Sequence, residues 1–394
     1  AERVGDTASI GELLWAAEHF SSSESRQLEA VIAGMGLKAI PAVISMARNT
    51  AAPFHSRSIA VRALSRLAMP QLMLITQELI EAELKRAEDS VVAKRSLKAH
   101  PHGGVGQTVL VRYYRDAAAE GLEFVLELMS LTGQLPDFDL IRASLSFANA
   151  RDRANAIETI QQSCARPMFE RIAALIDATV SIVGLQRGES EGALLPVASV
   201  LRRAAESTVA LEASAGLIAF QEQGIAGGFE ILRARLDRPQ GGRIQEWLIG
   251  LLPRFTETGV HFPLQAHPVE RVAALVRADF FSDARILALD YLASHAQERS
   301  WGDGEVVYGV EEPTEELYVI THGDVEIHRG ALHWVANAGT TFGERVLMGD
   351  KTRRDKVISR GASALVMQGE TVSRAIEIFP AMGVSLYQFK TISA

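Results

Sequence analysis

Residues whose types and spacing suit chemistry are concentrated between Thr340 and Val357, in the stretch TTFGERVLMGDKTRRDKV. Gly343 lies between Phe342 and Glu344, and a short apolar segment separates this turn from Arg353 and Arg354. A glycine lets backbone N–H groups approach an anion closely, and a following helical turn adds its positive end. An arginine about ten residues later can close on the same anion as a fork of donors. These residues therefore predict a phosphate-binding site.

The elements that position this stretch are predicted to be strands. Short runs rich in β-branched and aromatic residues, with glycines between them, lie at 306–308, 317–320, 325–328 and 332–335. Short strands at roughly ten-residue spacing with glycine turns predict a small antiparallel barrel or sandwich. Asp303-Gly304 and 321–324 are predicted to be hairpin turns. The segment 359–363 is expected to interrupt the strand after Val357, and the chain is predicted to return to helix from Thr371.

The chain from Ile10 to about His295 is predicted to be almost entirely helical. Apolar residues recur at helical spacing in segments of roughly 10 to 16 residues, broken by Pro, Gly or Asn. Such helices cannot bury their apolar stripes alone, whereas stacked pairs can, so the pattern predicts an α-solenoid with a period on the order of 40 residues. The run 100–104, His-Pro-His-Gly-Gly, is predicted to be an internal boundary or loop.

The predicted fold class is therefore α+β with several domains, an α-solenoid followed by a small antiparallel β-roll. Three domains are expected: N-terminal helical repeats over residues 1–99, further helical repeats over 107–296, and the β-roll with a C-terminal helix over 301–394.

The C-terminal part resembles the cyclic-nucleotide-binding domain. The resemblance rests on GDGEVVY, then ELYVITHGDVEI, then Phe342-Gly343-Glu344 and a trailing arginine, and it covers about Trp301 to Gln388. It implies that Gly343 offers its backbone N–H to a cyclic phosphate and that Glu344 accepts the ribose hydroxyl. Arg353, or Arg354 if the register shifts by one, would pair with the phosphate. The ligand implied is cyclic AMP or cyclic GMP.

The chain departs from this family in the second half of the cassette. Where the family has Pro-Arg-Ala-Ala-Thr, this chain has Thr352-Arg353-Arg354-Asp355-Lys356. The two small residues that admit the backbone to the phosphate are replaced by Arg and Asp, and the hydroxyl by Lys. Asp355 beside a phosphate would be a like charge. Two interpretations stay open: the roll binds a cyclic mononucleotide, or it is a structural scaffold that binds none.

A second resemblance covers residues 123–176, carried by LxxLTG, DLIRASL and RANAIETI. This part is similar to the HEAT-like repeats of bacterial proteins that join helical repeats to a major-facilitator or nucleotide-transporter-like membrane domain, with a cyclic-nucleotide-binding module at the end. It implies HEAT-like repeats and a membrane transporter as a linked domain or partner.

Composition limits the remaining classes of function. The net charge of −8 argues against nucleic-acid binding, and no apolar run approaches the roughly 18 residues of a membrane span. The single cysteine, Cys164, excludes an internal disulfide and suits the cytoplasm, including the cytosolic part of a membrane protein. The start, AERVGD, has neither Met nor a signal peptide, so a larger parent protein is expected. We see no nucleophile–base pair and no metal-ligand cluster, so an enzyme is not expected.

These observations lead to three hypotheses. The first is a cytoplasmic regulatory module in which a nucleotide in the β-roll biases the docking of the C-terminal helix, 372–389. The second is a nucleotide-independent interaction protein whose solenoid offers a concave face to a protein partner. The third is a part of a transporter that is needed only for its assembly or stability.

Overall fold

The computed structural model describes residues 7–146, 149–179, 193–238, 242–256, 266–313, 315–350, 352–380 and 382–383. The chain divides into two compact units. The first, here the helical unit, comprises residues 1–100 and 113–196, and the second, here the sheet-bearing unit, comprises 101–112 and 197–394. Helix α5 (Val105–Leu131) therefore contributes to both units. The fold class is α+β, with a mostly helical N-terminal region and a C-terminal antiparallel sheet.

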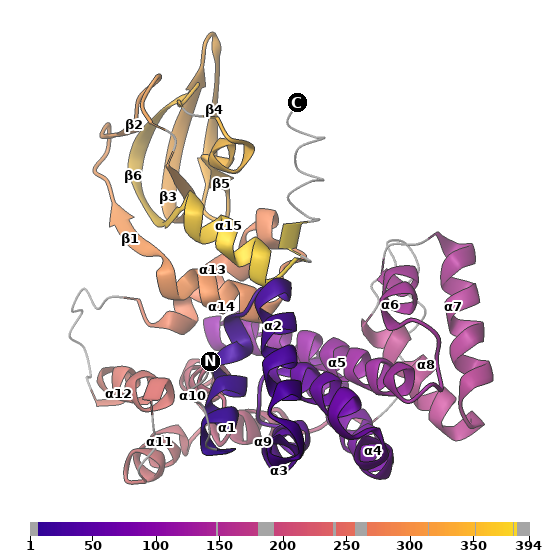
Figure 1. Cartoon of the computed structure of the whole chain (residues 1–394). Coiled ribbons are helices and arrows are strands. Elements are labelled where there is room, and N and C mark those ends of the chain that lie inside the picture. The colour runs from indigo at the N-terminus through magenta and orange to yellow at the C-terminus, as the bar shows by residue number, and fades with distance from the viewer. Residues whose placement is uncertain are drawn as a thin grey trace. The chain divides into compact units, whose positions relative to one another are not determined.

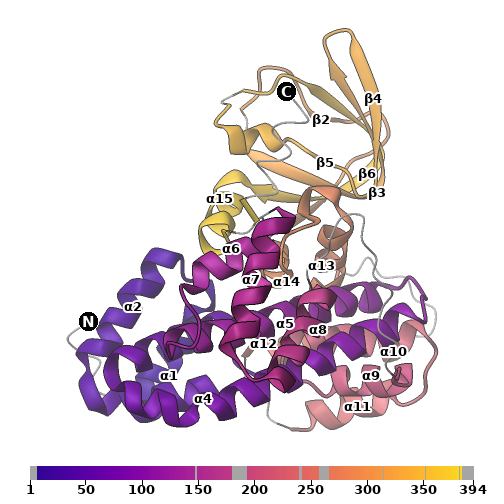
Figure 2. The same ribbon diagram turned by 90° about the vertical axis from the view of Figure 1, so that its right-hand side faces the viewer.

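The helical unit is built from helices joined by short turns (Figure 2). Besides the larger part of α5 it contains α1 (Thr7–Ala16), η1 (Ala17–His19), α2 (Ser22–Gly34), η2 (Gly36–Ala39), α3 (Ile40–Arg48), α4 (Phe54–Lys98), α6 (Phe138–Ser146), α7 (Ala150–Ser163) and α8 (Arg166–Thr179). The predicted helical character is confirmed. Neither HEAT repeats nor a solenoid is identified among the described helices, so the repeat architecture stays a prediction.

Helix α4 consists of two helical segments joined at a break. Ala68 has φ −159° and ψ 68°, and Pro70, which has no N–H to donate, begins the second segment. By length and composition α4 is apolar enough to cross a membrane, and so is the bent pair Ser22–Gly34 and Gly36–Arg48. Half of the apolar stretch of α4 is buried inside the protein. The expected absence of a membrane span therefore stays a prediction.

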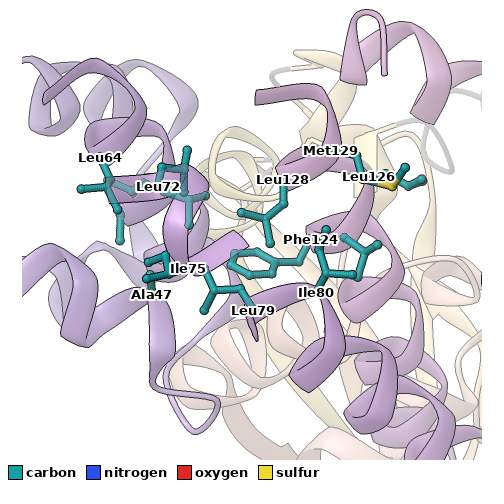
Figure 3. Close-up of a cluster of buried hydrophobic side chains, with 14 of the residues drawn as sticks. Ala47, Leu64, Leu72, Ile75, Leu79, Ile80, Phe124, Leu126, Leu128 and Met129 are labelled. Atoms are coloured by element: carbon teal, nitrogen blue, oxygen red, sulfur yellow. The ribbon is translucent and has the colours of Figure 1, made fainter. Parts of the chain in front are cut away.

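The core of the helical unit takes residues from α1 to α8, and Figure 3 shows a part of it that involves α4 and α5. Leu72 and Leu79 from α4 and Phe124 and Leu128 from α5 are almost completely buried there. Arg57 is buried in the same region, ion-paired to Glu83 at 2.6 Å, with its guanidinium 4.4 Å from the centre of the Phe124 ring. The core thus contains a charge pair whose two charges neutralise each other within the unit.

The sheet-bearing unit has its own helices. They are α9 (Val197–Ala205), α10 (Ala210–Glu222), α11 (Gly228–Leu236), α12 (Gly242–Thr256), α13 (Pro268–Arg277), η3 (Asp279–Phe281), α14 (Ile286–His295) and α15 (Gly369–Ile378). The break before α5 is confirmed, since α4 ends at Lys98 and α5 begins at Val105. The return to helix near Thr371 is also confirmed. Of the predicted C-terminal helix, 372–389, the residues 381 and 384–389 lie outside the described residues.

The sheet is antiparallel (Figure 1). Its strands run in the order β1-β6-β3-β4, with β2 also paired to β6 and β5 to β3, and η4 follows β5. The bounds are β1 (Gln297–Ser300), β2 (Val306–Tyr308), β3 (Glu316–Arg329), β4 (Leu332–Asn337), β5 (Thr341–Phe342), η4 (Glu344–Met348) and β6 (Lys356–Gln368). The two long strands, β3 and β6, form the centre of the sheet. In the sequence, most of the predicted phosphate-binding stretch lies between these two strands.

Two predicted interruptions of these long strands are wrong. The segment 321–324 is no hairpin turn but part of β3, and 359–363 is no break but part of β6. Gly323 (φ +65°) and Gly361 (φ +71°) face each other where the pairing register shifts. A β carbon on Gly323 would lie 2.4 Å from the carbonyl oxygen of Gly361. The glycines therefore allow a paired bulge, which bends both strands without ending them.

The Asp303-Gly304 turn is present, but it does not close a hairpin. Gly304 has φ +80° and its N–H donates to the carbonyl of Ser359 at 2.8 Å. The strands on either side of this turn, β1 and β2, both pair with β6 rather than with each other. The turn therefore connects two successive strands that pair with different parts of β6.

Candidate functional site

The predicted cassette begins with a turn at Gly343 that only glycine fits. Gly343 has φ +83° and directly precedes η4. A β carbon at this position would lie 2.8 Å from both Nη1 of Arg353 and the carbonyl oxygen of Glu316. Phe342 anchors the turn, since its buried ring stacks on Tyr318 with centroids 4.8 Å apart and an interplanar angle of 2°. The turn is thus fixed from the sheet side by an aromatic pair.

Arg353 lies directly against this turn and is buried, with 5% of its surface exposed. Its Nη2 donates to the carbonyl of Glu316 at 2.7 Å, and its Nη1 donates to the carbonyl of Gly343 at 3.4 Å. The carbon at the centre of its guanidinium is 4.3 Å from the centre of the Tyr308 ring and 5.6 Å from that of Tyr318. The structure thereby brings together the predicted residues Phe342, Gly343 and Arg353.

The charge of Arg353 has no anionic partner among the residues that the structure describes. No carboxylate lies within ion-pair distance of its guanidinium, and its buried Nε makes no hydrogen bond. Carbonyl oxygens and aromatic rings offset part of the cost of burying a cation, but they supply no opposite charge. An anion that reached this guanidinium would therefore gain a strong, charge-assisted interaction.

The other two predicted residues lie differently. Glu344 is half-buried, and within the described part of the chain its carboxylate makes neither a hydrogen bond nor an ion pair. Arg354 lies outside the cluster: its side chain is 62% exposed and 3.4 Å from Asp350. Arg345 pairs with the same carboxylate at 2.7 Å and lowers the pKa of Asp350. The geometry thus places Arg353, rather than Arg354, against Gly343.

Asp355, the residue expected to repel a phosphate, already has a cationic partner. It accepts two hydrogen bonds from Arg329, at 2.6 Å from Nε and 3.0 Å from Nη2. This pairing raises the pKa of Arg329. Lys356 begins β6, opposite His328 of β3. The negative charge at Asp355 is therefore neutralised within the sheet.

Two residues of this site were missed by the sequence analysis. Tyr308, at the end of β2, is 5% exposed, and burial raises the pKa of its hydroxyl. Glu316, at the start of β3, accepts from the Tyr318 hydroxyl at 2.6 Å and from Arg299 at 2.7 Å. In the sequence, Tyr308 is only the aromatic residue that ends a short β-branched run. Its position over Arg353 depends on strand pairing, which the local sequence does not encode.

A separate pocket of about 370 Å³ lies in the helical unit. It is lined by Arg62, Ser65, Arg66, Glu127, Ser130, Leu131, Asp137, Phe138 and Asp139. Its arginines have carboxylate partners, because Arg62 contacts Glu127 and Arg66 lies 3.0 Å from buried Glu29. Burial is the main cause of a raised pKa at Glu29. Unlike Arg353, the cations here are already neutralised.

No protein-family model matches this chain, and no curated protein matches it. Solved structures match it in part. The regulatory domain of Toxoplasma gondii PKA with cAMP is 16% identical, with a TM-score of 0.29, and the match covers 32% of this chain and 49% of that chain. The sensor domain of the regulator DNR from Pseudomonas aeruginosa is 16% identical over 30% of this chain and 85% of that chain, with a TM-score of 0.28.

The Thermus thermophilus catabolite activator protein is 19% identical, with a TM-score of 0.27, over 29% of this chain and 57% of that chain. This chain thus matches only about half of the first and third of these proteins. At such identities and TM-scores, the function has to be inferred from the residues of the site.

Proposed function

We propose that this protein is a regulatory module whose sheet binds the phosphate of a cyclic mononucleotide, cyclic AMP or cyclic GMP, at the cassette from Phe342 to Arg353. The observation that carries the proposal is Arg353, a cation beside the glycine turn with 5% exposure and, among the described residues, neither a carboxylate partner nor a hydrogen bond at Nε. A buried, unpaired guanidinium is a costly feature that an anionic ligand would relieve.

The chemistry requires little rearrangement at the arginine itself. The hydrogen bond from Arg353 Nη1 to the Gly343 carbonyl is long, at 3.4 Å, so exchanging it for a phosphate oxygen loses little and gains a charge-assisted bond. In this proposal the N–H of Gly343 donates to the phosphate. Glu344, whose carboxylate makes no hydrogen bond in the described residues, accepts from the ribose hydroxyl.

Calorimetric titration with cyclic AMP and cyclic GMP tests this proposal, with 5′-AMP as the ligand control. The wild-type chain is expected to bind a cyclic nucleotide with micromolar affinity. Arg353→Lys keeps the charge but loses the fork of donors, so we expect at least a roughly tenfold loss of affinity. Arg354→Ala is the matched control and is expected to bind like the wild type, because Arg354 lies outside the cluster. No heat at millimolar nucleotide would rule the proposal out.

A second candidate function is a nucleotide-independent interaction scaffold, in which the sheet is purely structural. It is favoured by the Tyr308 ring, which covers the guanidinium of Arg353, and by Asp355, whose charge is held by Arg329. In that case none of the cyclic nucleotides gives heat in the titration, and the partner is a protein.

We also propose that the module acts in the cytoplasm and that it has a protein partner or a linked transporter domain. In this proposal it catalyses no reaction. The support is the single Cys164 and the sequence resemblance of residues 123–176. Centrifugal fractionation of cells that express the native gene tests the setting. We expect to recover the chain with a transporter in the membrane fraction. Recovery of the chain only in compartments other than the cytosol and the cytosolic side of a membrane would contradict the proposal.

A further inference from the structure

The space above Arg353 is filled by aromatic rings. Tyr308, Tyr318 and Phe342 form one cluster, with ring centroids 5.7 Å apart for Tyr308 and Tyr318 and 6.0 Å apart for Tyr308 and Phe342. The Tyr308 ring lies over the guanidinium at 4.3 Å, and the Nε of Arg353 is shielded from solvent. Because Arg353 is 5% exposed, a phosphate reaches its guanidinium only if a neighbouring group moves.

Two of the three rings are firmly held. Tyr318 lies in the long strand β3, paired on both sides, and its hydroxyl donates to Glu316 at 2.6 Å. Phe342 stacks face to face on Tyr318 and is 4% exposed. Moving Tyr318 would disturb the centre of the sheet. Phe342 lies on the two-residue strand β5, and moving its ring would break the face-to-face stack on Tyr318, so neither ring is a suitable moving part.

Tyr308 is held much less. Its strand, β2, has three residues, pairs with β6 alone among the described strands, and shows a register irregularity between Val306 and Tyr308. Glycines lie on both sides of it, Gly304 with φ +80° before it and Gly309 directly after it. Within the described residues the Tyr308 hydroxyl makes no hydrogen bond. A short edge strand between glycines can move with small loss of backbone pairing.

We propose that Tyr308 is a gate over the phosphate site: its ring covers Arg353 in the ligand-free protein and must move aside when a cyclic nucleotide binds. This inference rests on the proposed function and deepens it, because it identifies the residue that sets the affinity. The ring competes with the phosphate for the same cation, so nucleotide binding includes the loss of the cation–π contact. The wild type should therefore bind the nucleotide more weakly than a variant that lacks this ring.

Titration of Tyr308→Leu with cyclic AMP and cyclic GMP tests the gate. We expect the dissociation constant to fall by roughly tenfold relative to the wild type, since the cation–π contact no longer opposes binding. Tyr308→Phe is the matched control: it keeps the ring and removes only an unbonded hydroxyl, so its affinity is expected to stay within about threefold of the wild type. Thermal unfolding of the ligand-free variants reports whether they are folded.

The outcomes separate the gate from the proposed function. If the wild type binds, Arg353→Lys loses binding and Tyr308→Leu binds no tighter than the wild type, the gate is wrong and the function stands. If both bind and Tyr308→Leu binds about tenfold tighter than the wild type, both are supported. If the wild type gives no heat, the function falls whatever the variant does. If neither gives heat, the function falls and the gate falls with it.

A measurement on the wild-type chain keeps the gate testable if Tyr308→Leu does not fold. Hydrogen exchange at the Val307 and Tyr308 amides is expected to speed up when saturating cyclic AMP is added. Heat of binding with unchanged or slower exchange at these amides would overturn the gate.

Discussion

Gly343 is the residue on which the cassette depends most directly. It combines a positive φ of +83° with two neighbours, Arg353 and the Glu316 carbonyl, at 2.8 Å from a built β carbon. Either condition alone would disfavour a side chain, and together they make glycine necessary for the fold of this turn. A glycine that is necessary for packing also permits a close approach of an anion, so its presence alone does not distinguish scaffold from binding site.

Gly343→Ala is therefore expected to lower the free energy of unfolding by about 2 kcal/mol or more. Gly349→Ala is the matched control, because Gly349 has a similar φ of +78° but nothing within 4 Å of a β carbon. Its expected loss is about 1 kcal/mol, the cost of the left-handed conformation alone. Urea unfolding of both variants measures the difference, and equal losses would show that the contacts with Arg353 and Glu316 are unimportant.

Arg353 and Arg57 illustrate two ways of burying a guanidinium in this chain. Arg57 pairs with Glu83 at 2.6 Å and lies over Phe124. Arg353 also lies over an aromatic ring but has carbonyl oxygens in place of a carboxylate. The contrast is the reason to expect a ligand at Arg353 and none at Arg57, because only the first lacks an opposite charge.

The connection between β2 and β3 is the strained element of the sheet. Glu311 has φ +69° and is the non-glycine residue with positive φ among the described residues. Its N–H donates to the carbonyl of Arg353 at 2.9 Å, and the N–H of Arg353 donates to the carbonyl of Glu312 at 2.8 Å. The strained residue thus lies in the segment that connects β2 to the backbone of Arg353. Backbone strain of this kind is typical of functional segments.

Relieving this strain is expected to stabilise the protein. Glu311→Gly keeps the left-handed conformation but removes its steric cost of about 1–2 kcal/mol. The added glycine costs about 0.5–1 kcal/mol in chain entropy. The free energy of unfolding should therefore rise by about 0.5–1 kcal/mol. Glu312→Gly, at a position without a positive φ, should instead lower it by a similar amount. Calorimetric melting of both variants checks the signs, and destabilisation by Glu311→Gly would show that its side chain matters more than its backbone.

Across the whole molecule, histidines buried in the neutral form make stability depend on pH. Burial lowers the pKa of His55 in the helical unit and of His267 in the sheet-bearing unit from 6.5 to about 4. Nε2 of His267 bonds the Trp247 carbonyl at 3.1 Å, while its Nδ1 accepts from the N–H of Val269 at 3.3 Å. Protonation would remove that acceptor from the start of α13.

The free energy of unfolding should therefore fall as the pH drops from about 6.5 towards 4. A group whose pKa is lower in the folded state contributes stability above its unfolded pKa, and the loss is up to about 1.4 kcal/mol per pH unit for each histidine. His267→Gln is expected to flatten this slope. Urea unfolding at pH 7, 6 and 5 measures the slopes, and identical slopes in the wild type and the variant would contradict the assignment.

The sequence by itself determined the elements whose signals are local. The helices α11, α12 and α13 begin at Gly228, Gly242 and Pro268, which are residue types predicted to break the helical region, because such signals act within a few positions. The Phe342-Gly343-Glu344 turn was found for the same reason: a left-handed glycine after a strand is a short-range signal.

Only the tertiary structure decided what depends on pairing between distant segments. Gly323 and Gly361 look like turn residues in sequence, yet both lie in paired strands with a positive φ, and a β carbon on Gly323 would lie 2.4 Å from the carbonyl oxygen of Gly361. Tyr308 covers Arg353 because the N–H and carbonyl of Arg353 bond the segment that follows β2, whereas the side chain of Arg354 is exposed. The choice of the buried arginine was therefore fixed by these contacts between distant segments and not by the order of the residues.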